Sequence, residues 1–216
     1  AGIESNVRSK THSEANRQLG IFLIILQNPV DICIGIATGD HGKGSAIWDK
    51  DGKKYIDFTS GIGVNSLGFC DDGWKNVVID QLNTLQHTSN LFFTQPCIKA
   101  AELLCKRTGM KKVFFSNSGA ESNEGAIKCA RKYSFTKYGE NRNKVITLVN
   151  SFHGRTVTTL AATGQDVFHK YFFPFTEGFE FAPANDFEKL VEMADDSTCA
   201  IMMELIQGEG GVMPLE

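Results

Sequence analysis

The sequence predicts an α/β fold built on a mostly parallel β-sheet. Short apolar and β-branched runs alternate with stretches of helical periodicity, and the runs are nearly continuous in apolar side chains, which is typical of strands covered on both faces. The chain has 216 residues, of which 42% are hydrophobic and 22% charged. This composition predicts a globular protein with one sizeable core.

The first regular element that the sequence predicts is a β-hairpin. Strand-like runs at residues 46–48 and 55–58 flank residues 49–52, which end in an Asp-Gly pair, a strong signal for a hairpin turn. The chain before residue 40 is harder to interpret. Its apolar run at residues 19–26 is too short for a membrane-spanning helix, which needs roughly 20 residues, and predicts a buried helix or strand.

An amphipathic helix is predicted between Pro96, which suits a helix start, and Gly109, which can cap a helix end in the left-handed conformation. The apolar side chains between them repeat at helical spacing: Cys97, Ile98, Ala101, Leu104 and Cys105.

The rest of the chain continues as alternating strands and helices. A short buried strand is predicted at residues 113–115, a helix at about 119–137 and a strand at 144–149. A further helix should begin at Asn185 or Asp186, either of which can cap it, and a buried strand should follow at the apolar segment Ala200, Ile201, Met202 and Met203.

Several classes of function are disfavoured by composition and spacing. The net charge is −3 and the basic residues are scattered, so nucleic acid is not a predicted partner. A membrane is not a predicted partner either, because the apolar run is too short to span one. The six cysteines form no C-x-x-C pair and no signal peptide is evident, which predicts a cytoplasmic protein. The five histidines have no H-x-x-x-H spacing, and no P-loop or G-x-G-x-x-G motif occurs, so no metal, ATP or NAD site is predicted.

One segment has the pattern of a phosphate-binding helix start. Ser118 is followed three residues later by Glu121, which is a capping box and places Ser118 at the N-cap. Gly119 and Ala120 then fall in the first turn, where backbone N–H groups have no intrahelical partner and small side chains allow an anion to approach. The same pattern also fits a well-capped helix that binds nothing.

The wider segment, residues 116–133 (SNSGAESNEGAIKCARKY), resembles the phosphate loop of the class-III (ornithine-type) aminotransferases. In that family the residues matching Ser118, Gly119 and Ala120 hold the phosphate of pyridoxal 5'-phosphate. The resemblance implies a fold type I transferase that depends on this cofactor. Residues 1–60 would be an amino-terminal segment that forms part of the small domain in the family, and residues 61–216 an incomplete large domain.

A second match, SFHGRT at residues 151–156, continues through LAATGQ at 160–165. The resemblance implies that Phe152 packs on the cofactor ring, that His153 helps to enclose the cofactor, and that Arg155 binds a substrate carboxylate. A planar guanidinium suits that task because it donates two parallel hydrogen bonds. Without the match, core packing for the phenylalanine and a surface ion pair for the arginine would be the simpler interpretations.

A third match, MELIQGEGGV at residues 203–212, follows a predicted strand. Ligands of open α/β sheets lie beyond the carboxyl ends of the strands, so Glu204 and Glu209 are candidate active-site carboxylates. Glu204 is assigned to the cofactor and Glu209 to the substrate, although both could be exposed loop acids. Leu205 departs from the proline that is usual in the family, and the glutamate matching Glu209 can pair there with an arginine from the carboxy-terminal part.

Weaker matches, including the tract around Asn90, are most similar to acetylornithine aminotransferases. The resemblance implies a homodimer that moves the terminal amino group of N-acetylornithine to 2-oxoglutarate in arginine biosynthesis, and Asn90 could serve the partner's site. 4-Aminobutyrate, ornithine or succinylornithine remain alternative amine donors. The lysine that forms the Schiff base is expected beyond Glu216, so no catalytic residue is assigned and these 216 residues alone should be inactive; a truncated, non-catalytic remnant is the other possibility.

Overall fold

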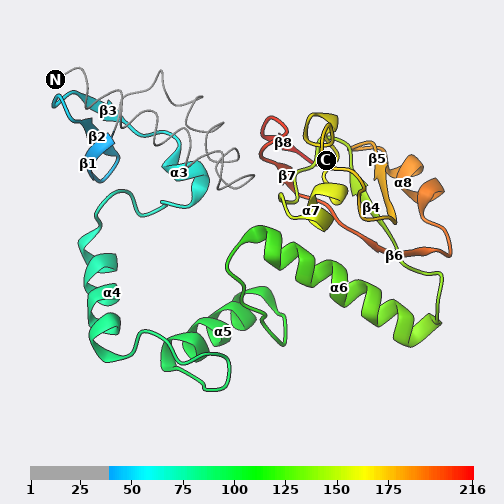
Figure 1. The fold of residues 1–216 in the computed structure, drawn as a ribbon, viewed down its shortest axis with the longest axis horizontal. Helices are drawn as coiled ribbons and strands as arrows, with labels where there is room; N and C mark the ends of the chain where they lie inside the picture. The colour runs from blue at the N-terminus through cyan, green and yellow to red at the C-terminus, as the bar shows by residue number, and fades with distance from the viewer. Residues whose placement is uncertain (1–38) are drawn as a thin grey trace, which may run out of the picture. The chain divides into compact units, whose positions relative to one another are not determined.

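The computed structural model describes residues 39–216. The chain divides into two compact units, one that ends at Phe93 and one that spans Thr94–Glu216. The parallel sheet and the helices α5 to α8 belong to the second unit (Figure 1). The apolar run at residues 19–26 lies outside the described residues, and the domain boundary at residue 60 stays a prediction.

The first unit contains the predicted hairpin as part of a three-stranded antiparallel sheet in the order β1-β2-β3. The Asp49 carboxylate stabilises the turn by accepting hydrogen bonds from the backbone N–H groups of Asp51 (3.0 Å) and Lys53 (2.9 Å). The first strand was not predicted, and the last one ends before residues 57 and 58. The bounds are Gly39–Lys43 for β1, Ala46–Asp49 for β2 and Lys54–Ile56 for β3.

Two further elements complete this unit. The short α3 (Ser60–Gly63) has positive φ angles at all four of its residues. The N-cap of α4 (Asp72–Thr84) is Asp71, whose carboxylate accepts a hydrogen bond of 2.7 Å from the backbone N–H of Trp74. The sequence analysis did not identify α4. Its apolar residues Trp74, Val78 and Leu82 recur four residues apart, so a helical pattern was present in the sequence. None of the residues of α4 is buried in the described structure.

The second unit begins with the predicted amphipathic helix, α5 (Gln95–Thr108), which Gly109 ends in the left-handed conformation at φ 75°. The strand predicted at residues 113–115 is wrong. Phe114 is 73% exposed, and in the described part of the chain no strand lies beside this segment. An apolar run becomes a strand only where a neighbour accepts and donates its ladder hydrogen bonds.

The parallel sheet has the order β5-β4-β6, with β4 in the centre. The predicted strand at 144–149 is confirmed as β4 (Lys144–Leu148), whereas β5 (Phe179–Ala182) was not anticipated. The last predicted strand, at residues 200–203, was misplaced, since β6 spans Thr198–Ile201. It is only partly buried, with Ile201 43% exposed, because it forms an edge of the described sheet.

Helices cover both faces of the sheet, as predicted. Ile146, Leu148 and Ala182 form the core on one face, against Leu190 and Met193 of α8 (Phe187–Met193). On the other face, Val145 alternates with these residues and lines an apolar cavity together with the side chains of α6 (Gly119–Tyr138), Ala126, Ile127 and Ala130. The predicted start of α8 at Asp186 is confirmed, since its carboxylate accepts from the Lys189 N–H at 2.8 Å.

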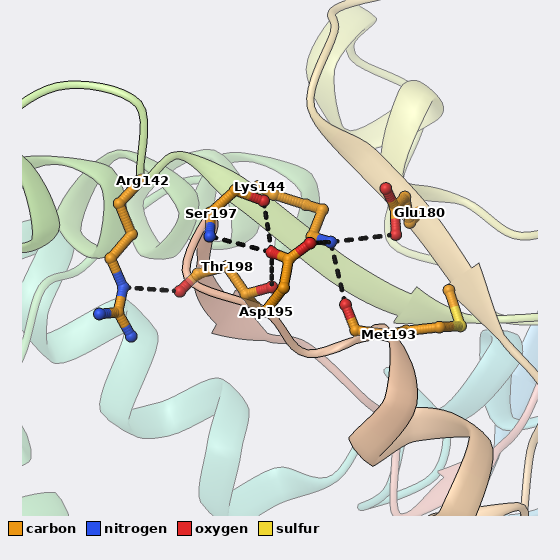
Figure 2. Close-up of polar contacts among 7 residues, drawn as sticks. All are labelled: Arg142, Lys144, Glu180, Met193, Asp195, Ser197 and Thr198. Carbon is orange, nitrogen blue, oxygen red and sulfur yellow. Dashed lines mark hydrogen bonds and ion pairs between the residues drawn. The ribbon is translucent and has the colours of Figure 1, made fainter.

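A buried lysine fixes the amino end of the central strand (Figure 2). The Lys144 side chain is 11% exposed, and its ammonium group lies 3.0 Å from Asp195 Oδ2, 3.3 Å from Glu180 Oε2 and 2.9 Å from the Met193 carbonyl. Burial would lower the pKa of Lys144, but the hydrogen bonds to the two carboxylates outweigh it and raise the pKa. The contacts join the three strands' amino ends to α8, opposite the edge where ligands of such sheets bind.

In the part of the chain that the structure describes, no helix is long and apolar enough to cross a membrane.

Candidate functional site

The predicted site residues of the second unit gather at the carboxyl edge of the parallel sheet. The loop after β4 carries Phe152, His153 and Arg155, and the loop after β6 carries Glu204. Both lie near the amino end of α6, which carries the phosphate-loop match. The structure therefore brings together segments that are up to 85 residues apart, between positions 119 and 204.

The start of α6 has the predicted cap. Ser118 Oγ accepts a hydrogen bond of 3.1 Å from the Glu121 N–H, but the Glu121 carboxylate accepts from the N–H of Asn117 (2.6 Å) rather than from that of Ser118. Among residues 39–216, the amides of Gly119 and Ala120 have no hydrogen-bond partner, and a Cβ at Gly119 would meet no atom within 4 Å. Two free amides thus point out of an open helix end, which is an arrangement that binds anions.

The loop at residues 153–156 is attached to the same end of α6. Asn123 Nδ2 donates a hydrogen bond of 2.8 Å to the His153 carbonyl, and Thr156 Oγ1 donates one of 2.5 Å to Glu124 Oε1. Gly154 packs so closely that a Cβ there would lie 2.7 Å from Ala120 Cβ. Only glycine fits this position, because its φ of 130° is also unfavourable for other residues.

Phe152 and Arg155 form a small aromatic and cationic cluster with Phe168. The two rings meet edge to face at 5.7 Å, and the guanidinium carbon of Arg155 lies 5.1 Å from the centre of the Phe168 ring and 5.9 Å from that of Phe152. Arg155 is exposed and Phe152 is partly buried. The guanidinium is therefore oriented by aromatic rings while its donors stay available to a ligand.

His153 is buried, with 4% of its surface exposed. Its backbone N–H donates to Thr163 Oγ1 at 3.0 Å, whereas its Nε2 atom is buried without a hydrogen-bond partner among the described residues. Burial lowers the pKa of this imidazole, so it is neutral at neutral pH. An unpaired polar atom in such a place calls for a partner outside the described residues.

Glu204 connects the two loops, because its Oε2 atom accepts a hydrogen bond of 3.0 Å from the backbone N–H of Phe152. Burial raises the pKa of Glu204, the hydrogen bond from Phe152 lowers it, and the negative charge of Glu209 raises it further.

Glu209 lies in the turn between β7 (Ile206–Gln207) and β8 (Met213–Pro214). Its carboxylate accepts a hydrogen bond of 2.5 Å from Gln165 Nε2, which also donates to the Ser151 carbonyl at 3.2 Å. The turn is fixed to the loop after β4, since the buried Gln207 donates from Nε2 to the Val149 carbonyl at 2.9 Å.

Sequence reasoning did not assign a role to several residues that shape this site: Asn123, Glu124, Thr156, Thr163 and Gln165. Three of them could have been noticed in the sequence. Asn123 and Glu124 lie one helical turn after Ala120, and Thr156 precedes a helix, where threonine is a common cap. The sequence gives no such indication for Thr163 and Gln165. Their partners, however, lie 30 or more residues away, a relationship that no local pattern reveals.

A family model for class-III aminotransferases matches residues 33–216. The chain belongs to this family. An acetylornithine aminotransferase of Haemophilus ducreyi is 59% identical over 177 residues, which cover 82% of this chain and 45% of the relative. A succinylornithine transaminase of Photorhabdus laumondii is 43% identical over 176 residues, which cover 82% of this chain and 44% of the relative. This chain therefore spans less than half the length of these curated relatives.

The fold agrees with this membership. The crystal structure of an ornithine aminotransferase from Toxoplasma gondii ME49 superposes with a TM-score of 0.79 at 30% identity, covering 89% of this chain and 47% of that one. The α/β fold with its parallel sheet is the fold type I of aminotransferases that use pyridoxal phosphate, as predicted. The implied cofactor also fits the residues present, because the site offers two free amides at a helix end, a partly buried aromatic ring and a buried imidazole nitrogen without a partner.

Proposed function

We propose that the full-length protein to which these residues belong is an aminotransferase that uses pyridoxal phosphate to move the terminal amino group of N-acetylornithine to 2-oxoglutarate. The observation that carries the proposal is the convergence of the free helix end of α6, the Phe152 loop and Glu204 at one edge of the parallel sheet. The names of the relatives support the choice of substrate.

Each residue has a distinct task in this proposal. Ser118, Gly119 and Ala120 bind the phosphate through the helix end, where the dipole adds about 0.3–1 kcal/mol for an exposed anion. Phe152 packs against the ring of the cofactor, His153 donates from its neutral imidazole at the buried side, and Glu204 fixes the backbone of the Phe152 loop. The dipole alone does not give sufficient affinity, so other groups must also bind the cofactor.

The substrate is bound by charged groups of opposite sign. Arg155 takes the carboxylate of the amine donor, because its guanidinium is held by two rings with its donors exposed. Glu209 is held by Gln165, a neutral donor that leaves the carboxylate charge uncompensated and free to attract a cationic group. When bound, pyridoxal phosphate supplies an electron sink that stabilises negative charge beside the reacting carbon.

The experiment is to express the complete reading frame and to purify the protein with pyridoxal phosphate. We expect a bound-cofactor absorbance band and formation of glutamate from 2-oxoglutarate with N-acetylornithine as donor. A complete protein that binds no cofactor would leave the non-catalytic remnant as the correct interpretation. A reading frame that stops after Glu216 would support the same conclusion.

Other amine donors of the same class are the second candidate. The relatives include a succinylornithine transaminase, and the superposed structure is an ornithine aminotransferase. Parallel assays with succinylornithine, ornithine and 4-aminobutyrate therefore belong to the same experiment. A higher kcat/KM with one of these donors would replace N-acetylornithine in the proposal and leave the roles of the site residues unchanged. Homodimerisation and a cytoplasmic location also remain proposals.

A further inference from the structure

The first two turns of α6 present one polar face to the loop that carries Phe152 and Arg155. Ala120, Asn123 and Glu124 are spaced three and four residues apart, which places them on the same side of the helix. Ala120 contacts the backbone at Gly154, and Asn123 binds the His153 carbonyl. Glu124 makes the third contact, in which its Oε1 atom accepts a hydrogen bond from Thr156 Oγ1.

Glu124 receives its hydrogen bond from a hydroxyl that is itself part of a network. Thr156 Oγ1 lies 2.5 Å from Glu124 Oε1 and 2.7 Å from Thr159 Oγ1, and Thr159 Oγ1 accepts from the Thr156 N–H at 3.1 Å. The last of these contacts is one half of the capping box of α7 (Val157–Ala162), in which the Thr156 side chain also accepts from the backbone of Thr159. Thr163 Oγ1 donates to the Thr159 carbonyl at 2.9 Å and accepts from the His153 N–H at 3.0 Å.

We propose that Glu124 and Thr156 are positioning residues that hold the Phe152–Arg155 loop against the phosphate-binding end of α6. Neither residue touches the ligand. Their hydrogen bond joins the helix end that binds the phosphate to the residue next to Arg155, so it sets the distance between the phosphate site and the carboxylate site. This inference rests on the proposed function for its catalytic consequences, whereas the ordering of the loop can be measured without any ligand.

Burial and connectivity favour this role over that of a surface hydrogen bond. Thr159 and Thr163 are fully buried, with 0% of their surface exposed, and Glu124 and Thr156 are partly buried. A carboxylate that accepts from one hydroxyl in such surroundings makes a charge-assisted hydrogen bond, which is stronger than a neutral one. Among the described residues, loss of the hydroxyl would leave the loop attached to α6 by Asn123 and by the close packing at Gly154.

The test compares Thr156→Val with the matched control Thr158→Val in the full-length protein. Valine keeps the size of threonine and removes the hydroxyl. Thr158 lies in the first turn of α7, which Thr156 caps, and among the described residues its hydroxyl contacts only Thr176 Oγ1, at 3.3 Å. We expect Thr156→Val to raise the dissociation constant of pyridoxal phosphate and the KM for the amine donor about fivefold each, with kcat changed less than about twofold. Thr156→Ser, which keeps the hydroxyl, should restore both values.

Hydrogen exchange in the ligand-free protein provides the readout that does not depend on activity. The amides of residues 152–155 should exchange about fivefold faster in Thr156→Val than in the wild type or in Thr158→Val. The effect of the Glu124→Ala, Thr156→Val double variant should be smaller than the sum of the two single effects, because both changes break the same Glu124–Thr156 hydrogen bond. Equal exchange rates in Thr156→Val and Thr158→Val would overturn the inference, even if the wild type transaminates. Faster exchange in a protein that does not transaminate would refute the proposed function and keep the positioning role.

Discussion

The Glu204 carboxylate accepts a hydrogen bond of 3.0 Å from the backbone N–H of Phe152 and thereby joins the loops that follow two neighbouring strands, β6 and β4. This arrangement has an electrostatic cost. Burial raises the pKa of Glu204, and the hydrogen bond from Phe152 offsets only part of the rise, to which the charge of Glu209 also contributes. The loop contact is therefore maintained by a carboxylate whose charged form the folded protein disfavours.

Replacing this carboxyl should change how stability depends on pH. The pKa of Glu204 in the folded protein lies above its ordinary value of 4.5, so the folded protein binds the proton more tightly than the unfolded chain. Its stabilising contribution is complete below the unfolded pKa and is lost as the pH rises through the folded pKa. Glu204→Gln has no such loss, so its free energy of unfolding, relative to wild type, should increase as the pH rises above 4.5 and through the raised pKa of Glu204. Urea unfolding at several pH values measures it, and a difference that does not vary with pH would contradict the prediction.

A second prediction concerns the close contact between Gly154 and α6. Alanine at this position would place its Cβ 2.7 Å from both Ala120 Cβ and Thr159 Oγ1, at a φ of 130°. We expect Gly154→Ala to lower the free energy of unfolding by about 2–4 kcal/mol, from overpacking and backbone strain together. Gly119→Ala is the matched control, since its Cβ meets nothing within 4 Å, and it should change stability by less than about 1 kcal/mol. Similar losses in both variants would show that the contact is not tight.

Local sequence patterns predicted the helices whose first or last residue is a recognisable cap. The helix α6 begins at Ser118 because that side chain caps it, and α5 ends where Gly109 can adopt a positive φ. The open helix end with its free amides follows from the same capping pattern and was therefore predictable. The assignment of a cofactor required the resemblance to the family, because a capped helix alone does not specify a ligand.

Patterns failed where structure depends on distant residues. The segment at 113–115 has the composition of a strand but no neighbouring strand among the described residues. The strand β6 is only partly buried, because it lies at an edge of the described sheet. The pair of Glu124 and Thr156 is separated by 32 residues, and that of Gln165 and Glu209 by 44. Such contacts are consequences of the sheet topology, which local sequence patterns do not determine.

A third prediction concerns the buried Lys144 at the opposite edge of the sheet. Lys144→Met keeps most of the aliphatic volume but removes the ammonium group from Asp195, Glu180 and the Met193 carbonyl. Because the lysine side chain is 11% exposed while both acids are about half exposed, the loss should be intermediate, about 1–2 kcal/mol. Lys189→Met breaks only an exposed pair with Glu192 and should cost less than about 0.5 kcal/mol. Chemical denaturation compares the two, and equal costs would show that Lys144 is no more than a surface pair.

The last prediction separates the charge of Arg155 from its geometry. Arg155→Lys keeps the positive charge but removes the planar fork that can donate two parallel hydrogen bonds to a carboxylate. It also removes the guanidinium that lies 5.1 Å from the Phe168 ring centre and 5.9 Å from that of Phe152, so the cation is no longer oriented by two aromatic faces. In the full-length protein we expect the KM for the carboxylate-bearing donor to rise about tenfold, since a bidentate charged pair is worth more than a single contact.

The kinetic pattern decides the interpretation of this variant. Arg107→Lys in the last turn of α5 is the control, because that side chain is exposed and remote in sequence from the three matched segments. It should leave KM and kcat unchanged. If Arg155 binds the substrate carboxylate equally in the ground state and in the transition state, KM rises while kcat is nearly constant. A fall in kcat at unchanged KM would instead place the guanidinium at the reacting atoms, and the assignment of Arg155 to substrate binding would then be wrong.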